Sequence, residues 1–465
     1  MSTQWNIKLI KQYENDSGQA LLTDEQTLVS FSQDFGHLIH SKPSAVCIPN
    51  SIDSLQSLIQ FANEHKLPVT IRGKGLSQCG QSLAKAGGLI VSMQNFSHAL
   101  QMDDQGIWVE ANTSWAALLD VSLAQAKAPF VLPYNCNLSV AGVLSAGGVG
   151  ASSFKYGAIN AHVAALEVVD GLGNINLVNA SSSLFKACLS GQGQFGIITK
   201  AYIQLRSAKK MAKSFYLVYE TEEQWFKDMA IIRNEVDYIE MFCSPSIQGA
   251  KLVGDKRVPI AQWLYGMHLT IEYDEIEPEI SQLTRLIKPW KVINTQVESI
   301  SSYFLRHNSR FKMMEALGQW NLSHPWYECF VPTSVLKQYL PTLLEKLPIH
   351  YASLVHVVPM AKRGADFLML PEDESVCSVM ILNPGVPEPL KESCFDAIKL
   401  LDQCFLPQGG KRYLSGFLGY NIDDEYWTTH FGTHYSQWNH LKREYDPNGI
   451  FNSVLHHTNS RDKTF

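Results

Sequence analysis

The apolar positions in the first part of the chain change repeatedly between strand and helix spacing. Leu55, Leu58, Ile59 and Ala62 recur at helical spacing and lie between two β-like runs. The β-like runs in this part are 45–48, 69–71, 89–93, 107–109, 164–169, 175–178 and 197–205, and the helical segments are 55–62, 113–123 and 183–189. This mixture predicts an α+β domain over residues 40–207, preceded by a segment over residues 1–39.

A second block, residues 208–410, also contains runs of both kinds but has no glycine-rich motif. The β-like runs are 215–219, 238–242, 263–273, 354–359 and 376–382, and the helical runs are 334–346 and 390–404. This pattern predicts an antiparallel sheet covered by helices, which is suited to capping a substrate. Residues 412–418 and a helix over 435–445 form a closing segment, which we expect to return to the first domain as residues 411–465.

Composition and charge narrow the class of protein. The 465 residues are 45% hydrophobic and 18% charged, with a net charge of -6, which is typical of a soluble globular chain. No long Lys/Arg cluster is present, so we expect a small-molecule partner and no nucleic acid. The N-terminus is polar, and no run approaches the roughly 20 apolar residues that span a bilayer. We therefore expect a cytoplasmic protein without a membrane span.

The cysteines and histidines do not predict a metal site. The nine cysteines include no C-x-x-C pair, so neither a disulfide framework nor a zinc site is indicated. Cys79 lies inside a glycine-rich segment, where we expect its side chain to fill space. His430 and His434 are four residues apart, but the sequence singles out no third ligand. We expect no metal.

Two glycine-rich segments carry the strongest chemical signal. Residues 72–81, RGKGLSQCGQ, follow a predicted strand, and Gly73, Gly75 and Gly80 permit positive φ and close backbone approach. Successive N–H groups of such a loop can converge on a pyrophosphate. Residues 138–157 interleave glycine, serine and apolar positions, which suits a backbone pressed against a flat ligand. Together they predict a nucleotide cofactor in the first domain, without the single Rossmann crossover.

Seven separate segments resemble one family of flavoproteins. They are RGKGLSQCGQ, LSVAGVLSAGGVG, FKYG at 154–157, GQFGIITKA at 193–201, HPWYECFVP at 324–332, HFG at 430–432 and KREYDP at 442–447. In this order they resemble FAD-linked oxidases of the vanillyl-alcohol oxidase (PCMH-type) superfamily, and within it cytokinin dehydrogenase. That family oxidatively removes an isoprenoid side chain from an N6-substituted adenine. The resemblance implies a two-domain PCMH-type FAD-binding fold with an antiparallel-sheet cap domain.

The resemblance also implies which residues contact FAD. They are Gly73, Lys74, Gly75, Leu76, Ser77 and Gln81 in the first loop, Ser139, Ser145 and Val149 in the second, Ile198, and Tyr413 in the closing segment. The family's covalent histidine falls on Leu76, so we expect FAD to be bound noncovalently. Two late flavin contacts of the family, a serine and a glutamine, fall on Asn452 and Leu455.

The catalytic positions depart from the family. Its aspartate, which accepts a hydrogen bond from the substrate amine, falls on Tyr134, and its second carboxylate falls on His268. Using a tyrosine of pKa about 10 as a base at pH 7 costs about 4 kcal/mol, whereas a phenol orients a hydroxyl substrate without that cost. His268 is a candidate base near neutral pH. Glu240, Glu272 and Glu328 are alternative carboxylates.

These features predict an FAD-dependent oxidoreductase that takes a hydride from a C–H bond next to nitrogen or oxygen. The resemblance implies an N6-substituted adenine as the first substrate to test, and oxygen or a quinone-like molecule as the electron acceptor. Two alternatives stay open. One is an alcohol or sugar oxidase that uses Tyr134 and His268, and the other is a flavin-binding protein without catalytic activity.

Overall fold

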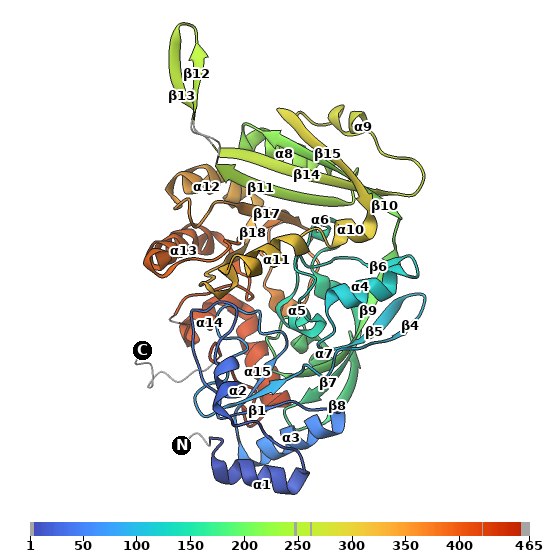
Figure 1. The fold of residues 1–465 in the computed structure, drawn as a ribbon, viewed down its shortest axis with the longest axis vertical. Coiled ribbons are helices and arrows are strands. Elements are labelled where there is room, and N and C mark those ends of the chain that lie inside the picture. Colours follow the sequence, from blue (N-terminus) through green and yellow to red (C-terminus); the bar gives the residue numbers. More distant parts are fainter. Residues whose placement is uncertain (1–3, 246–248, 261–262, 421, 457–465) are drawn as a thin grey trace.

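The computed structural model describes residues 4–245, 249–260, 263–420 and 422–456 (Figure 1). The first domain and the C-terminal helices form the lower part in this view, and a large sheet with its helices forms the upper part. The fold confirms the α+β class and the antiparallel cap sheet. None of the described helices has the length and apolarity that a membrane span requires.

A small parallel sheet delivers the first glycine-rich loop. β1 (Ala45–Cys47) and β2 (Val69–Arg72) both pair with the central β3 (Leu89–Ser92). α3 (Ile52–His65) connects β1 to β2 and buries the four apolar residues whose spacing predicted a helix. Its N-terminus is capped by the Ser51 hydroxyl, which accepts from an N–H one turn into the helix. Because β2 ends at Arg72, the loop over 73–81 begins at the edge of a rigid sheet.

A second, antiparallel sheet completes the first domain. Its strand order is β4-β5-β9-β7-β8, and β6 pairs with β9. The strands are β4 (Ala99–Met102), β5 (Gly106–Glu110), β6 (Lys127–Pro129), β7 (Val163–Asp170), β8 (Ile175–Asn179) and β9 (Gly196–Ser207). The helices of this part are α4 (Trp115–Leu123), α5 (Val140–Ala146), α6 (Ser153–Tyr156) and α7 (Ser183–Cys188). The second glycine-rich segment thus contains α5 and α6.

The cap is built on an eight-stranded sheet of order β15-β10-β14-β11-β17-β18-β16-β19. Its strands are β10 (Met211–Tyr219), β11 (Tyr238–Pro245), β14 (Trp263–Tyr273), β15 (Lys291–Ser299), β16 (Tyr327–Pro332), β17 (Val355–Met360), β18 (Val376–Ile381) and β19 (Lys411–Arg412). One face packs against α8 (Glu222–Ile232) and α12 (Thr333–Lys346), with α13 (Lys391–Phe405) beside them. The opposite face is turned toward the first domain. The hairpin of β12 (Gly249–Val253) and β13 (Lys256–Ile260) projects from the cap (Figure 1).

The closing segment contacts both domains. β19 adds a strand to the cap sheet, and the chain then passes through α14 (Asp424–Phe431) and α15 (Tyr435–Tyr445) to β2. Lys442 of α15 is half-buried, and its Nζ donates to the carbonyls of Gln194 and Phe451 and to the Asp446 carboxylate, each at 2.7 Å. The KREYDP motif therefore serves to attach the C-terminal helix to the first domain.

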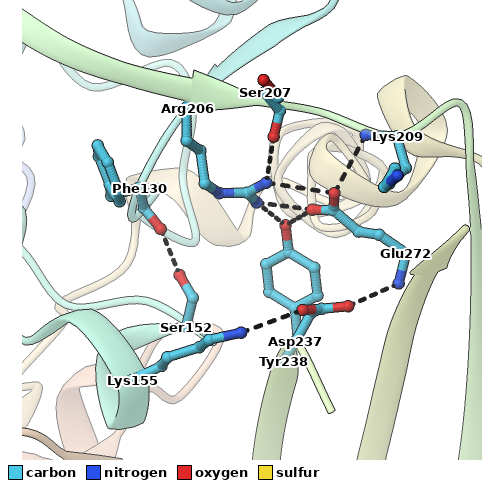
Figure 2. A network of polar contacts seen from close by, with 9 residues as sticks. All are labelled: Phe130, Ser152, Lys155, Arg206, Ser207, Lys209, Asp237, Tyr238 and Glu272. Carbon is cyan, nitrogen blue, oxygen red and sulfur yellow. Dashed lines mark hydrogen bonds and ion pairs between the residues drawn. The ribbon is translucent and has the colours of Figure 1, made fainter.

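A half-buried ion pair joins the two domains where the chain first passes between them (Figure 2). Arg206, at the end of β9, contacts both carboxylate oxygens of Glu272 on β14, at 2.6 and 3.2 Å. The Tyr238 hydroxyl donates to the same carboxylate and accepts from Arg206. Burial raises the pKa of Glu272, but the hydrogen bonds and charge of Arg206 outweigh it, so that the pKa lies below its ordinary value. Glu272 thus has a structural role at this junction.

Replacing Glu272 with alanine should destabilise the protein strongly. The change leaves the half-buried Arg206 without its counter-ion, which costs about 3 kcal/mol of unfolding free energy, the lower end of the range for a buried pair. Because the folded-state pKa is lowered, the contribution of Glu272 is complete above its unfolded pKa of about 4.3 and is lost as pH falls through the folded-state value. Urea and thermal unfolding midpoints, measured from pH 3 to pH 7, test both statements.

The matched control is Asp396→Ala, which breaks the exposed pair between Lys399 and Asp396. We expect that variant to lose about 0–1 kcal/mol. Equal effects of the two substitutions would contradict the role assigned to the Arg206–Glu272 pair.

Candidate active site

One cavity lies between the glycine-rich loops and the cap sheet. Its volume is about 300 Å³, which is within the range of small-molecule sites. It is lined by every residue for which the sequence predicts a flavin contact in the loops, β9 and the closing segment, namely Gly73, Lys74, Gly75, Leu76, Ser77, Gln81, Ser139, Ser145, Val149, Ile198 and Tyr413. Tyr134 also lines it, whereas His268 does not. Asn452 and Leu455, the expected late contacts, do not reach the cavity wall either.

The backbone of the first loop is prepared for an anionic group. Within the described part of the chain, the N–H groups of residues 73–77 donate no hydrogen bond to protein. Gly75 has φ +69 and Gly80 has φ +75, a region that L side chains rarely adopt. A Cβ at Gly73 would lie 2.6 Å from the Ser139 hydroxyl, so the two glycine-rich segments meet closely here. Unpaired N–H groups beside the Lys74 ammonium fit the diphosphate of FAD.

A buried carboxyl, which no sequence motif indicated, holds this loop in place. Asp34 accepts hydrogen bonds from the N–H groups of Gly36 at 3.1 Å and Gly80 at 2.8 Å, and from the Ser77 hydroxyl at 3.2 Å. Burial raises the pKa of Asp34 to about 6, although these hydrogen bonds act in the opposite direction. Asp34 belongs to no motif, and more than 40 positions separate it from Ser77 and Gly80, the loop residues that it contacts.

The first loop offers no residue for covalent attachment at the cavity wall. Leu76 lines the cavity and has no nucleophilic atom. Cys79 is buried and does not line the cavity, and its sulfur accepts from the N–H of Leu418 at 3.4 Å. Burial raises the pKa of the Cys79 thiol to about 12, which keeps it protonated. The thiol therefore packs between the loop and the closing segment.

The cap sheet presents a row of side chains to the cavity. Glu328 on β16, Met380 on β18, His356 on β17 and Phe242 on β11 are successive cross-strand neighbours, and all four line the cavity. The imidazole of His356 stacks on Phe242, with ring centroids 4.5 Å apart. Burial lowers the pKa of His356 to about 3, so this ring is neutral.

His268 is displaced from the cavity by one strand. It lies on β14 opposite Glu240, and its ring packs against Phe242 at 4.9 Å between centroids. Phe242, on the neighbouring strand β11, lines the cavity, whereas His268 does not. Burial lowers the pKa of His268 to about 4, which makes it a weak base at neutral pH. The prediction of His268 as a base that faces the substrate therefore does not fit this geometry.

Tyr134 lies at the corner where the first domain meets this row. Its ring contacts His356 at 4.6 Å and His307 at 5.3 Å between centroids. Its hydroxyl oxygen is buried and has no hydrogen-bond partner among the described residues. Burial, and then the negative charge of Glu240, raise the pKa of Tyr134 well above its ordinary value. The phenol is therefore protonated and available to donate a hydrogen bond.

Beside Tyr134, a buried carboxylate supports a histidine on the cavity wall. Glu240 on β11 accepts from Nε2 of His307 at 3.0 Å and from Arg306 at 2.8 and 3.0 Å. Burial raises the pKa of Glu240, but the charge of Arg306 and the hydrogen bond with His307 outweigh it and hold the pKa well below the ordinary value. Because an ionised carboxylate only accepts, Nε2 of His307 carries a hydrogen, and in the neutral tautomer of this ring Nδ1 keeps a lone pair. Sequence reasoning proposed Glu240 as a relocated acid but missed His307.

Glu328 is a second titratable carboxyl on the cavity wall. The Ser415 hydroxyl donates to it, and burial raises its pKa to about 7. Of the three alternative carboxylates, Glu328 lines the cavity, Glu240 supports a lining residue, and Glu272 joins the domains. His430 is buried among aromatic rings of the closing segment. Within the described residues, no three His, Cys, Asp or Glu side chains gather as a metal site.

Comparison with protein families identifies the cofactor and the family. The model of an FAD-binding domain matches residues 43–178, and the model described as "Cytokinin dehydrogenase 1, FAD and cytokinin binding" matches residues 209–454. The fold and the cavity therefore define an FAD-dependent oxidoreductase, and the free N–H groups of the first loop fit its cofactor. The chain belongs to the cytokinin dehydrogenase family, within the PCMH-type FAD-linked oxidases.

Curated relatives match this chain over nearly its whole length. The uncharacterized oxidoreductase ORF5 in the fasciation locus of Rhodococcoides fascians is 26% identical, covering 91% of this chain and 96% of the relative. Cytokinin dehydrogenase 3 of Arabidopsis thaliana is 25% identical, covering 96% of this chain and 91% of the relative. Cytokinin dehydrogenase 9 of Oryza sativa subsp. japonica is 27% identical, with 90% and 87% covered. At this identity the family and cofactor are shared, while substrate groups can differ.

Replacing Asp34 with alanine should weaken FAD binding. The change leaves the N–H groups of Gly36 and Gly80 unpaired and releases the first loop. A buried donor without its partner costs about 1–3 kcal/mol, so we expect the Kd for FAD to rise about tenfold or more. Quenching of flavin fluorescence during titration of the apoprotein measures this. Asp24→Ala, which removes an exposed helix cap, is the control and should leave FAD affinity unchanged. An unaltered Kd in Asp34→Ala would show that the loop does not need the carboxyl.

Proposed function

We propose that this protein binds FAD noncovalently and dehydrogenates a small molecule at a C–H bond next to nitrogen or oxygen, with His307 as the proton acceptor. The observation that carries the proposal is the contact of Glu240 with His307 on the cavity wall, beside the position where the family has its aspartate. A carboxylate that holds a neutral imidazole is a recurring arrangement for a general base.

FAD supplies the acceptor for the hydride that leaves the substrate carbon. When a carbon loses a hydride, the attached N–H or O–H must lose its proton for a neutral C=N or C=O bond to form. Nδ1 of His307 takes that proton, and the Glu240 carboxylate stabilises the resulting imidazolium, as the Nε2 contact at 3.0 Å allows. Arg306 keeps Glu240 ionised throughout, so the proton stays on His307.

Tyr134 has a complementary role. Its protonated hydroxyl has no partner within the described residues and donates to the substrate heteroatom, which orients the N–H or O–H toward His307. An N6-substituted adenine is the first amine to test, because relatives named cytokinin dehydrogenase share this fold. An alcohol or sugar is the second candidate, since a phenol and an imidazole suit a hydroxyl. Oxygen or a quinone-like molecule then reoxidises the cofactor.

Acid precipitation of the purified holoprotein should release yellow FAD into the supernatant. Leu76 has no atom that forms a bond with the flavin, and the Cys79 thiol is buried away from the cavity wall. Absorbance of the supernatant and of the redissolved pellet measures the distribution. Flavin that stays with the denatured protein would contradict noncovalent binding.

His307→Asn should slow reduction of the bound flavin under anaerobic conditions. Removing a general base typically costs about 10²–10⁴-fold in rate, so we expect a decrease in that range in stopped-flow measurements. Glu240→Gln should have the same direction of effect, because it removes the charge that stabilises the imidazolium. The FAD content of each variant must equal that of the wild type, which separates a chemical role from a loss of cofactor.

The matched control is His268→Asn. His268 lies on the cap sheet opposite Glu240, but it does not line the cavity. We expect it to retain the wild-type rate within a few fold. Glu328→Gln distinguishes the two candidate bases. If a limb of the pH–rate profile for flavin reduction persists in Glu328→Gln and disappears in His307→Asn, that limb belongs to the imidazole of His307. Equal rates in His307→Asn and the wild type would reject His307 as the base, and no reduction by any amine or alcohol in a broad panel would reject the enzymatic proposal.

A further inference from the structure

We propose that the cavity contains an anion subsite at Arg310, so that the substrate carries a carboxylate or phosphate group in addition to the C–H bond that is oxidised. The inference concerns the same cavity and rests on the proposed function. Arg310 lies on α11 (Asn308–Ala316) of the cap and lines the cavity. Its Nη2 donates to the carbonyl of Leu382 at 2.6 Å. Within the described residues, Arg310 forms no ion pair with a carboxylate.

Three other arginines that the fold removes from water each have a carboxylate partner. Arg206 pairs with Glu272, Arg306 with Glu240 and Arg412 with Asp402, at distances of 2.6 to 3.0 Å. A guanidinium taken out of water without a counter-ion is unfavourable, because the low-polarity surroundings do not replace its hydration. Burial lowers the pKa of Arg310, with no acid nearby to oppose that effect. A ligand anion would supply the missing partner.

The position of Arg310 lets one ligand contact both it and His307. The two residues are three positions apart at the start of α11, where His307 is the N-terminal cap. Side chains at this spacing lie on one face of a helix with their Cβ atoms about 5–6 Å apart. Both line the same cavity. A small molecule can therefore place its reacting N–H or O–H at His307 and an anionic group at Arg310.

The rest of this end of the cavity defines the body of the ligand. Phe311, which follows Arg310, Trp320, whose ring packs against Phe311, and Leu382, whose carbonyl Arg310 contacts, provide apolar lining at this end. The diphosphate of FAD does not explain the free cation, because it has the N–H groups of the first loop and Lys74 as its own donors. The ligand class is thus an apolar or aromatic body with one carboxylate or phosphate. Such a ligand differs from a neutral purine base.

Matched ligands test the subsite on the FAD-loaded protein. Phenylacetate and phenyl phosphate are the anionic probes, phenylacetamide is the neutral one, and an indole-3-acetate and indole-3-acetamide pair repeats the comparison with a larger body. Perturbation of the flavin visible spectrum during titration gives each Kd, and thermal stabilisation gives an independent value. We expect at least one anionic probe to bind about tenfold more tightly than its neutral partner, which corresponds to about 1.4 kcal/mol. A preference for carboxylate or for phosphate identifies the group.

Arg310→Gln should remove this preference, so that the ratio of the two Kd values approaches one, whereas Arg310→Lys should keep part of it. The control is Arg285→Gln, an exposed cap arginine that also donates to a backbone carbonyl and does not line the cavity. It should retain the wild-type ratio. If Arg310→Gln fails to fold, Arg310→Lys and competition by inorganic phosphate in the wild type give the same comparison.

Two results would overturn the subsite. One is equal binding of every anionic probe and its neutral partner by the wild type. The other is an Arg310→Gln variant that keeps the preference, or one whose main defect is weaker FAD binding, which would place Arg310 against the flavin. Failure of the proposed function can be distinguished from failure of the subsite. Anion preference without flavin reduction by any substrate rejects the proposed chemistry alone. Rapid flavin reduction by neutral substrates without anion preference rejects the subsite alone.

Discussion

The active site depends on the burial of one ionised carboxylate. Glu240 lies inside the cap, where an unpaired charge would be strongly unfavourable, so the fold surrounds it with Arg306 and His307. That arrangement fixes the tautomer and the orientation of His307 on the cavity wall. Burial raises the pKa of Tyr134 most, and the negative charge of Glu240 adds to that effect, so the phenol stays protonated. The hydrogen-bonding properties of His307 and Tyr134 on the cavity wall thus depend on Glu240, which does not itself line the cavity.

The first domain and the cap each contribute one side of the cavity. The first domain supplies a glycine-rich loop at the end of β2, whose free N–H groups suit a diphosphate, and Asp34 holds that loop from outside. The cap supplies a row of side chains across β16, β18, β17 and β11. The Arg206–Glu272 pair at the junction keeps the two halves in register (Figure 2). An ion pair thus joins the two domains at one point, and in the proposed mechanism another ion pair positions His307.

Local signals in the sequence predicted the fold and the cofactor loops, because glycine loops and apolar spacing are properties of short segments. The α+β class and the cap sheet followed from them, and the resemblance of the motifs to a flavoprotein family implied FAD. Contacts between distant segments could not be predicted in this way: Glu240 and His307 are 67 positions apart, and His307 belongs to no motif. His268 was predicted as a base from alignment with the family's second carboxylate. The structure places it on β14, one strand beyond Phe242, and outside the residues that line the cavity, a lateral position that alignment of short motifs does not reveal.

The central claim is that His307, held by Glu240, receives the substrate proton. A crystal structure of the FAD-loaded protein with a bound, slowly reacting amine or alcohol tests it most directly. We expect the ligand nitrogen or oxygen next to the oxidised carbon to lie about 2.6–3.2 Å from Nδ1 of His307, with the Tyr134 hydroxyl also in contact with it. A ligand whose heteroatom instead contacts Glu328, with His307 beyond hydrogen-bond distance, would contradict the role of His307 as proton acceptor.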